Sequence, residues 1–345
     1  MISKHFRICV VGEWLHGHPD EGIHNLAQNL IVQWGKDHTV WTIKIGEDLA
    51  VNRLFLNLML RKKLRDIQPD LIFYISPSSA KITALIRAKM LKVYAPQAKV
   101  LVVALQPVTY NRLERQLLPL FVPDGIFVQS PRSKELLQGI HCPVYFLPSG
   151  VDLDRFMPVE ADQKKALRKR YGIDDRALVV LHVGHINRNR NIHIFSNIEE
   201  LEGVQVLLVG STSTPQDEDL LFELTRNKVT VIRDFLPHIE EVYQLTDIYI
   251  FPVKSEDAAV GVPLSVLEAL ACNLPVISTP FGGLPVLFEE GDGIYYYENE
   301  SKVPELISSV GANSKNCTSE KVKPYSWEKV AQLMLKMISP EEVVF

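Results

Sequence analysis

One carboxylate, Glu268, stands in an otherwise apolar stretch whose layout favours anion binding. Residues 260–283 read VGVPLSVLEALACNLPVISTPFGG. Pro263 before an apolar helical segment and a strand that runs into glycines are common start and stop signals, which predict the helix 264–271 and the strand 275–279. Such a unit brings a helix N-terminus to one edge of a sheet, where free backbone N–H groups and the helix dipole favour an anion. The first ligand to expect is a phosphate or diphosphate.

Glu268 itself needs a partner. Leucines and alanines make the predicted helix apolar nearly all round, and an unpaired carboxylate is costly to bury there. The two hydroxyls of a ribose would suit it, because a carboxylate can accept hydrogen bonds from both. An ion pair inside the fold is the alternative, and the sequence leaves both interpretations open.

A second group of polar residues follows Gly184, which ends an apolar run. His185, Arg188 and Arg190 come directly after it. The guanidinium of Arg190 could clamp a diphosphate with two parallel hydrogen bonds; a solvated basic loop is the other interpretation. A single histidine such as His185 is more often a local hydrogen-bonding residue than a ligand.

Cofactor and metal motifs are missing from the sequence. Gly12 and Gly184 both end predicted strands, but neither continues as G-x-G-x-x-G, which argues against NAD chemistry. No H-E-x-x-H or G-x-S-x-G pattern occurs. The cysteines form no C-x-x-C pair, so we expect them to be reduced and mostly buried, without a zinc site. They are Cys9, Cys142, Cys272 and Cys317.

The elements that must position these residues alternate between strands and helices. This alternation, typical of βαβ units and parallel sheets, runs from residue 7 to residue 149. It starts again at residue 178, after the charged stretch 159–177, which we interpret as a polar linker. A chain of 345 residues suits two domains of about 150 residues better than one. Ligands of such sheets bind at the carboxyl ends of strands, so we expect the site in the cleft between the domains.

Composition and charge narrow the class of protein. With 46% hydrophobic and 23% charged residues the chain is of the soluble globular type. No apolar run approaches the ~20 residues that span a bilayer, and the first residues are interpreted as a strand rather than a signal peptide, so we expect a cytoplasmic protein. Up to residue 150, 18 lysines and arginines stand against 11 acidic residues, and the remainder has 19 against 30. The basic first half suggests an anionic or membrane-bound acceptor.

Segment 55–67, FLNLMLRKKLRDI, is a candidate for contact with a membrane surface. Its basic residues flank a leucine-rich face, as in peripheral membrane helices. A packed helix with a solvated basic face is the interpretation that we favour. The basic residues are Arg61, Lys62, Lys63 and Arg65.

Five segments carry a resemblance to a known family: FLPSGVDLDRFMP, VLHVGHINRNRNI, VTVIRDFLPHIEEVYQLTDIYIFPV, GVPLSVLEALACNLPVISTPFGGLP and YSWEKVA. Together they resemble the retaining glycosyltransferases of family 4 (glycosyltransferase group 1). The resemblance implies an α/β GT-B fold, with two Rossmann-like doubly wound domains facing a central cleft. The acceptor-binding domain would be residues 1–160 completed by a crossover helix in 326–345, and the donor-binding domain would be residues 161–325.

The resemblance assigns roles to individual residues. Arg190, in the loop that begins with Gly184 and His185, falls where the family has a lysine on the donor diphosphate. Glu268 matches the second glutamate of an E-x7-E motif, which holds the ribose. The loop that contacts the donor sugar and phosphates would consist of Val260, Gly261, Val262, Pro263 and Leu264. The loop that reaches into the cleft would consist of Glu21, Gly22, Ile23 and His24.

Several positions depart from the family pattern. Val260 replaces the first glutamate of E-x7-E, and His185 replaces an arginine. Glu256 and Asp257 lie just upstream of Val260 and could reach the sugar instead, although a solvated acidic turn is the favoured interpretation. The remaining departures are Glu21 for a glycine, Gln106 for a histidine and Val286 for a glutamate.

The function implied is metal-independent, retaining transfer of a sugar from a UDP- or GDP-linked donor to an acceptor hydroxyl, without a further cofactor. The acceptor would be a glycan, a lipid-linked or a small molecule, and no nucleic acid is expected. Stabilisation of the leaving diphosphate would come from Arg190, the N–H groups of residues 261–264 and a protonated His185. The alternative is a catalytically impaired nucleotide-sugar-binding subunit that scaffolds or regulates a partner glycosyltransferase. An epimerase, the third candidate, would need acidic groups that the motif region lacks.

Overall fold

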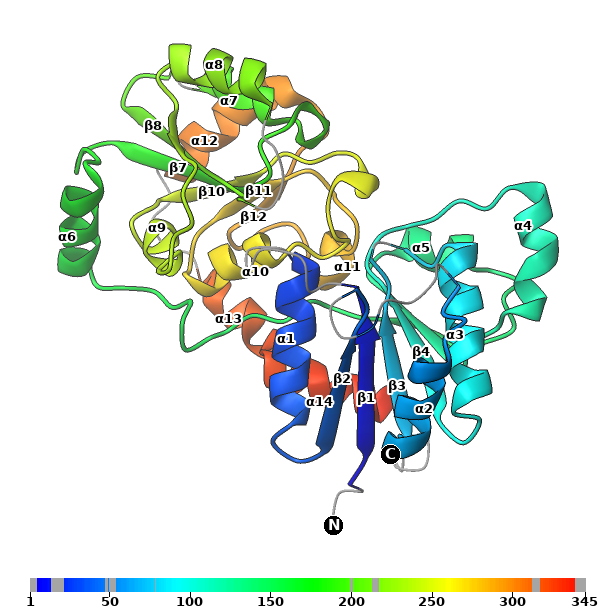
Figure 1. The fold of residues 1–345 in the computed structure, drawn as a ribbon. Coiled ribbons are helices and arrows are strands. Elements are labelled where there is room, and N and C mark those ends of the chain that lie inside the picture. Colours follow the sequence, from blue (N-terminus) through cyan, green and yellow to red (C-terminus); the bar gives the residue numbers. More distant parts are fainter. Residues whose placement is uncertain are drawn as a thin grey trace. The chain divides into compact units, whose positions relative to one another are not determined.

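The chain divides into two compact α/β units. Unit 1 comprises Met1–Pro148 and Trp327–Phe345, and unit 2 comprises Ser149–Ser326 (Figure 1). The structure is a computed structural model that describes residues 5–13, 22–46, 49, 54–77, 79–198, 201–212, 217–311 and 317–338.

Unit 1 is built on a parallel six-stranded sheet of order β2-β1-β3-β4-β5-β6. Its inner strands are almost continuous apolar runs, as expected where both faces of a sheet are covered. The strands are β1 (Arg7–Gly12), β2 (Thr39–Lys44), β3 (Leu71–Ile75), β4 (Lys99–Ala104), β5 (Gly125–Val128) and β6 (Val144–Phe146). The helices are α1 (Gly22–Trp34), α2 (Leu58–Ile67), α3 (Ile82–Tyr94), α4 (Arg112–Leu117), α5 (Pro131–Leu136) and α14 (Trp327–Ile338).

Helix α14 brings the end of the described chain back to unit 1. Its buried residues include Trp327, Val330 and Met334. The indole Nε1–H of Trp34 at the end of α1 donates to the Ala331 carbonyl at 3.1 Å. The Trp34 ring stacks on the ring of Phe73 in β3, with 4.4 Å between the ring centroids. This face of the sheet is therefore covered by two helices that lie at opposite ends of the sequence.

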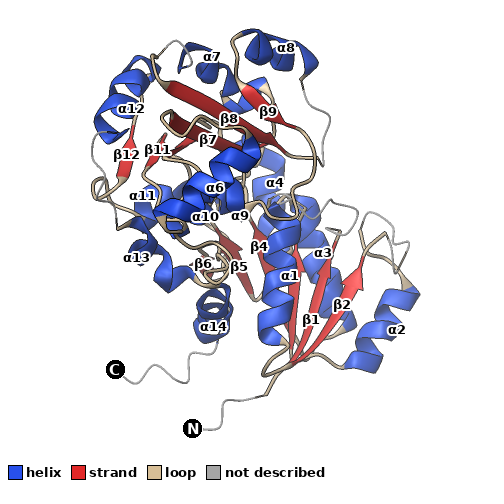
Figure 2. Cartoon of the chain, turned by 90° about the vertical axis from the view of Figure 1, so that its left-hand side faces the viewer, coloured by secondary structure: helices blue, strands red, loops and turns tan. Residues whose placement is uncertain are grey.

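Unit 2 also has a parallel six-stranded sheet, of order β12-β11-β10-β7-β8-β9. Figure 2 shows helices on both sides of this sheet. The strands are β7 (Leu178–Gly184), β8 (Val204–Gly210), β9 (Thr230–Ile232), β10 (Ile248–Phe251), β11 (Val276–Ser278) and β12 (Ile294–Tyr296). The helices are α6 (Ala161–Tyr171), α7 (Phe195–Ile198), α8 (Glu218–Arg226), α9 (Glu240–Gln244), α10 (Leu264–Ala271), α11 (Leu284–Leu287), α12 (Val303–Gly311) and α13 (Thr318–Val322).

The charged stretch 159–177 is not an extended linker, because most of it forms helix α6. Arg168 is buried, and its guanidinium pairs with Asp247 at 2.6 Å while Lys164, one turn earlier, pairs with the same carboxylate at 2.7 Å. The helix ends at Gly172, which takes the left-handed conformation. Charge pairing rather than an apolar stripe attaches α6 to unit 2.

The boundary between the units falls at residues 148 and 149, earlier than the 160 and 161 predicted from the sequence. Contacts of the intervening residues with unit 2 account for the difference. The Ser149 hydroxyl donates to the Val262 carbonyl at 2.6 Å, and Arg155 pairs with Glu240 at 2.7 Å. Among the described helices, none combines the length and the apolar character that a membrane span requires.

Candidate functional site

The strand order of unit 2 identifies the edge where a ligand should bind. From β7 the chain proceeds to β8 and β9 on one side, and then returns to β10, β11 and β12 on the other. The loops that follow β7 and β10 therefore diverge at a topological switch point, which is where doubly wound sheets bind their ligands. Arg190 lies in the first loop, and residues 256–263 lie in the second.

Arg190 joins these two loops. It ends a 3-10 turn, Arg188–Arg190, which Asn187 caps by accepting the Arg190 backbone N–H at 3.1 Å. Its Nε–H donates to the Ala258 carbonyl, 68 positions further along the chain, at 3.0 Å. The side chain thus packs against the second loop instead of extending into solvent, and burial lowers its pKa to about 10.

Gly184 provides the space that the guanidinium occupies. Its φ is +154°, and a Cβ atom at this position would lie 2.6 Å from Nη1 of Arg190. A side chain here would therefore push Arg190 away, so glycine at the end of β7 is a requirement of the site.

Arg190 carries a charge that the described part of the chain does not neutralise. No carboxylate among the described residues forms an ion pair with it, and its hydrogen bond goes to a neutral carbonyl. A half-buried cation without a counter-charge is unfavourable unless a ligand supplies one. The arrangement suits an anion such as a diphosphate.

The loop 260–263 is fixed from two sides and presents the start of α10. The Gly261 carbonyl accepts the Gly283 N–H at 2.8 Å, and Gly282, with a φ of +54°, approaches this carbonyl so closely that a Cβ would lie 2.2 Å from it. The Ser149 bond holds the Val262 carbonyl. Pro263 caps α10 without a side-chain hydrogen bond, so the cap residue's side chain does not occupy the first N–H groups of the helix, the kind of group that binds anions.

Glu268 lies one turn into α10 and is held by a tyrosine. The Tyr243 hydroxyl of α9 donates to Oε2 at 2.7 Å. Burial raises the pKa of Glu268 to about 7, and the Tyr243 bond opposes that rise. No cation among the described residues forms an ion pair with Glu268, so the ion-pair interpretation is not what this structure shows. Oε1 has no partner in the described residues and remains available to a hydroxyl.

His182 belongs to the same site, although its sequence gave only a weak signal. It is fully buried in β7, its Nδ1 lies 2.9 Å from the Ile250 carbonyl, and its Nε2 has no hydrogen-bond partner among the described residues. Burial lowers its pKa to about 3. In the sequence, His182 stands inside the apolar run LVVLHVG, a pattern typical of an ordinary buried strand.

The remaining predicted residues of unit 2 surround this edge. His185 follows β7 directly and is half-buried. Glu256 and Asp257 form a 3-10 turn with Ala258, the partner of Arg190. Val260, at the position of the first motif glutamate, is half-buried, and Val286 in α11 is 56% exposed.

The predicted residues of unit 1 follow two of its strands. Gly22 begins α1, the helix after β1, and His24 lies in its first turn. Gln106 follows β4 and pairs as an isolated bridge with Ser79. Both strands end at the same edge of the sheet, separated by β3. Glu21 lies outside the described residues.

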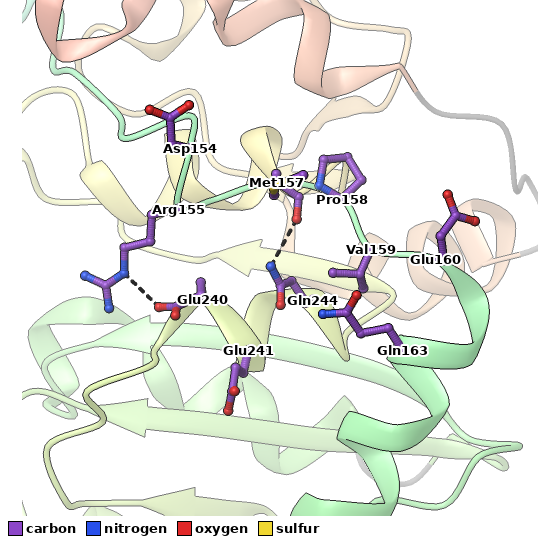
Figure 3. Close-up of a pocket in the computed structure, with 10 residues that line it drawn as sticks. All are labelled: Asp154, Arg155, Met157, Pro158, Val159, Glu160, Gln163, Glu240, Glu241 and Gln244. Atoms are coloured by element: carbon purple, nitrogen blue, oxygen red, sulfur yellow. Dashed lines mark hydrogen bonds and ion pairs between the residues drawn. The ribbon is translucent and has the colours of Figure 1, made fainter.

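A cavity of about 520 Å³ lies elsewhere in unit 2 (Figure 3). Its lining combines one arginine, Arg155, with four carboxylates, and Gln244 donates to the Met157 carbonyl at its wall. None of its lining residues comes from the loops after β7 and β10. A predominantly acidic lining repels a diphosphate, so this cavity is not the anion site. The carboxylates are Asp154, Glu160, Glu240 and Glu241.

Among the residues that the structure describes, no three His, Cys, Asp or Glu side chains lie close enough together to hold a metal ion. The four cysteines are free, two of them buried, one half-buried and one, Cys317, exposed.

Comparison with known proteins agrees with this geometry. Residues 177–312, most of unit 2, match the family described as glycosyl transferases group 1. A D-inositol 3-phosphate glycosyltransferase from Mycobacteroides abscessus is 29% identical over 235 residues, 61% of this chain and 51% of the relative. An alpha-galactosylglucosyldiacylglycerol synthase from Streptococcus pneumoniae is 22% identical over 66% of this chain and 61% of its own. The chain spans about half the length of the first of these relatives.

Solved structures show the same fold over nearly the whole chain. HepE from Anabaena, crystallised with UDP and glucose, superposes with a TM-score of 0.73 at 14% identity, covering 97% of this chain and 99% of its own. A sucrose-phosphate synthase from Thermosynechococcus elongatus gives a TM-score of 0.69 at 16% identity, covering 96% and 98%. The chain therefore has the GT-B fold, and its residues 177–312 resemble the group 1 glycosyltransferases.

Proposed function

We propose that the protein transfers a sugar from a nucleoside diphosphate sugar to an acceptor hydroxyl, with retention of the anomeric configuration and without a metal ion. The observation that carries this proposal is Arg190, a half-buried cation with no counter-charge in the described residues, at the switch point of unit 2. HepE, which shares the fold, binds UDP, and UDP is therefore the first nucleotide to try.

In the proposed reaction, each group acts on a different part of the donor. Arg190 and the first N–H groups of α10 hold the diphosphate, and Glu268 accepts from the ribose hydroxyls. The bond between the sugar C1 and the phosphate oxygen breaks while the acceptor oxygen forms a bond to C1 on the same face. The acceptor proton passes to the leaving diphosphate, whose negative charge Arg190 stabilises without a metal ion.

The test combines binding with transfer. UDP, GDP, ADP and their common sugar conjugates are screened by thermal shift, with and without EDTA. A ligand at 100 times its Kd should stabilise the protein by about 2.7 kcal/mol. The donor that stabilises is then incubated with candidate acceptors, and the anomeric configuration of the product is assigned by NMR. Inversion, or complete loss of transfer in EDTA, would refute the mechanism.

A second candidate function is supported by Val260. With a valine where the family has its first motif glutamate, the donor sugar loses a carboxylate contact, while the diphosphate and ribose contacts remain. Such a chain would be a nucleotide-sugar-binding subunit that regulates or scaffolds a partner glycosyltransferase. Donor binding without transfer to any acceptor and without donor hydrolysis would favour it.

We further propose that unit 1 contacts an anionic membrane from the cytoplasmic side, through the start of α2. Asn57 caps this helix by accepting the N–H groups of Met59 and Leu60. Leu58 is 80% exposed and Met59 is 64% exposed, and the basic residues 61, 62, 63 and 65 follow. Exposed apolar side chains next to basic residues are suited to an interface with acidic lipid headgroups.

Sedimentation with liposomes tests this contact. Wild-type protein should pellet with vesicles that contain phosphatidylserine and stay in solution with phosphatidylcholine alone. The double variant Leu58→Ser/Met59→Ser should lose most of this binding. Val32→Ser is the matched control, because Val32 is also an exposed apolar residue of unit 1, 58% exposed on α1. Equal pelleting of all three proteins, or none, would remove the membrane from the proposal.

A further inference from the structure

His182 presents a buried hydrogen-bond acceptor that has no donor. Its Nδ1 lies 2.9 Å from the Ile250 carbonyl. A carbonyl only accepts, so Nδ1 carries the ring proton and Nε2 of the neutral imidazole has a bare lone pair. Among the described residues Nε2 has no partner, and His182 is fully buried. A buried acceptor without a donor is unfavourable, so its retention in β7 requires an explanation.

The guanidinium of Arg190 is a candidate donor to Nε2 of His182. The rings of Phe195, Tyr249 and Phe251 have their centroids 5.6, 6.2 and 6.3 Å from the imidazole. Beside Gly184, however, the point where a Cβ would stand is 3.3 Å from Nε2 of His182 and 2.6 Å from Nη1 of Arg190. The lone pair and the guanidinium therefore flank the same small space, which the missing side chain of Gly184 keeps open.

We propose that His182 is the positioning residue for Arg190: Nε2 accepts a hydrogen bond from Nη1 when an anion is bound, while the Ala258 carbonyl accepts from Nε. Two of the three guanidinium nitrogens are then held by the protein, and the N–H groups of Nη2 point to the anion. This inference rests on the proposed function only in taking the anion to be the diphosphate of a nucleotide.

The neutral state of the ring is consistent with this role. Burial and the nearby positive charge of Arg190 both lower the pKa of His182, to about 3. The imidazole is therefore neutral near pH 7, and its Nε2 can act as an acceptor there. A ring that became protonated would instead repel the guanidinium.

Three variants of His182 separate positioning from packing. His182→Phe keeps a ring and removes both nitrogens. His182→Asn keeps a group near Nδ1 that can bond Ile250, but places no acceptor near Nε2. His182→Gln reaches the Nε2 position with an amide oxygen. We expect the Kd for UDP and for inorganic diphosphate to rise about tenfold in the Phe and Asn variants and to stay within about threefold in the Gln variant.

The control measurements exclude a general loss of structure. Affinity for uridine, which lacks phosphate, should be unchanged in all variants. Tyr297 is the matched control residue, because its hydroxyl is also buried without a partner, in the same unit. Tyr297→Phe should leave diphosphate affinity as it is in the wild type.

The outcomes separate this inference from the proposed function. Equal diphosphate affinity in wild type and His182→Phe overturns the inference and leaves glycosyl transfer untouched. Diphosphate binding that depends on His182 in a protein that transfers no sugar supports the inference and refutes the transfer. If the wild type binds neither nucleotide nor inorganic diphosphate, Arg190 has no anion to be positioned for, and the inference is wrong.

Discussion

The two units each hold a half-buried arginine near their topological switch point, and the two arginines differ in their partners. In unit 1, where the switch lies between β1 and β3, Arg87 donates to the Tyr74 hydroxyl at 3.0 Å and pairs with Glu13 at 3.0 Å. Its guanidinium also lies 4.9 Å from the Phe55 ring centroid. In unit 2, Arg190 bonds a neutral carbonyl and has no carboxylate partner among the described residues.

This difference teaches where the anion should go. The charge of Arg87 is paired within unit 1, whereas that of Arg190 has no carboxylate partner among the described residues and, in the proposed function, pairs with the diphosphate. Both units have the same kind of sheet, so the fold alone does not decide which one binds the diphosphate. The presence or absence of a counter-charge beside the arginine does.

Replacing the two arginines is the strongest test of this comparison. Arg190→Ala should weaken UDP binding about 100-fold and reduce turnover with it, because it removes charge-assisted hydrogen bonds of about 1.5–3 kcal/mol each. Arg87→Ala should leave the Kd for UDP unchanged but lower the melting temperature, since it leaves Glu13 unpaired. Calorimetric titration and thermal melting measure both. Equal affinity losses in the two variants would abolish the distinction between the units.

A methyl group at Gly184 should act on Arg190 indirectly. Gly184→Ala is expected to weaken UDP binding about tenfold, because its Cβ would displace the guanidinium and its φ is unfavourable for an L-residue. Gly203→Ala is the control for backbone strain, since Gly203 has a φ of +78° and open space around it. The control should be less stable but bind UDP normally. If both variants bind like the wild type, Gly184 does not set the position of Arg190.

The affinity for UDP should depend on pH through the ionisation of Glu268, and this change should be smaller than the loss expected for Gly184→Ala. With a pKa of about 7 in the free protein, the carboxyl is mostly neutral near pH 6 and mostly ionised near pH 8. Only the ionised form accepts from both ribose hydroxyls, so UDP affinity should rise about threefold over this interval.

Stability of the unliganded protein should change in the opposite direction. Because the folded-state pKa of Glu268 is raised above its unfolded value, its contribution to stability is fully present below the unfolded pKa and is lost as the pH rises through 7. Glu268→Gln should flatten both pH profiles, as measured by titration and thermal melting at each pH. A wild-type affinity profile that Glu268→Gln leaves unchanged would assign the titration to another group.

The smallest expected effect belongs to Tyr243. Its hydrogen bond lowers the pKa of Glu268, so Tyr243→Phe should move the midpoint of the affinity profile upward by about one pH unit. A midpoint that does not move would show that the tyrosine packs against Glu268 without tuning it.

Much of the fold could be predicted from local patterns. The helix at 264–271 was predicted with the bounds that the structure has, because Pro263 gives a clear start signal before an apolar run. Helix α6 was missed since its inward positions include Arg168, which is buried only because Asp247, 79 residues later, neutralises it. A helix attached through charge has no apolar stripe to reveal it.

The candidate site was predictable in its parts but not in its connections. Arg190, Gly184 and Glu268 could be selected from their local sequence. The bond between Arg190 and Ala258 depends on β7 and β10 being neighbours, which no local pattern contains. His182 was overlooked because a histidine in an apolar strand resembles an ordinary core residue until its ring nitrogens are checked for partners.

The return of α14 to unit 1 has a consequence for synthesis on the ribosome. Unit 2 lies between the two segments of unit 1, so all of its strands have emerged before Trp327 is made. Until then, the face of the first sheet around Trp34 and Phe73 lacks the helix that covers it, while unit 2 can already fold on its own residues. The nascent chain therefore exposes an apolar surface on its earlier-made unit after its later-made unit is complete. A chaperone acting on this protein should bind unit 1 during that interval and leave when α14 docks.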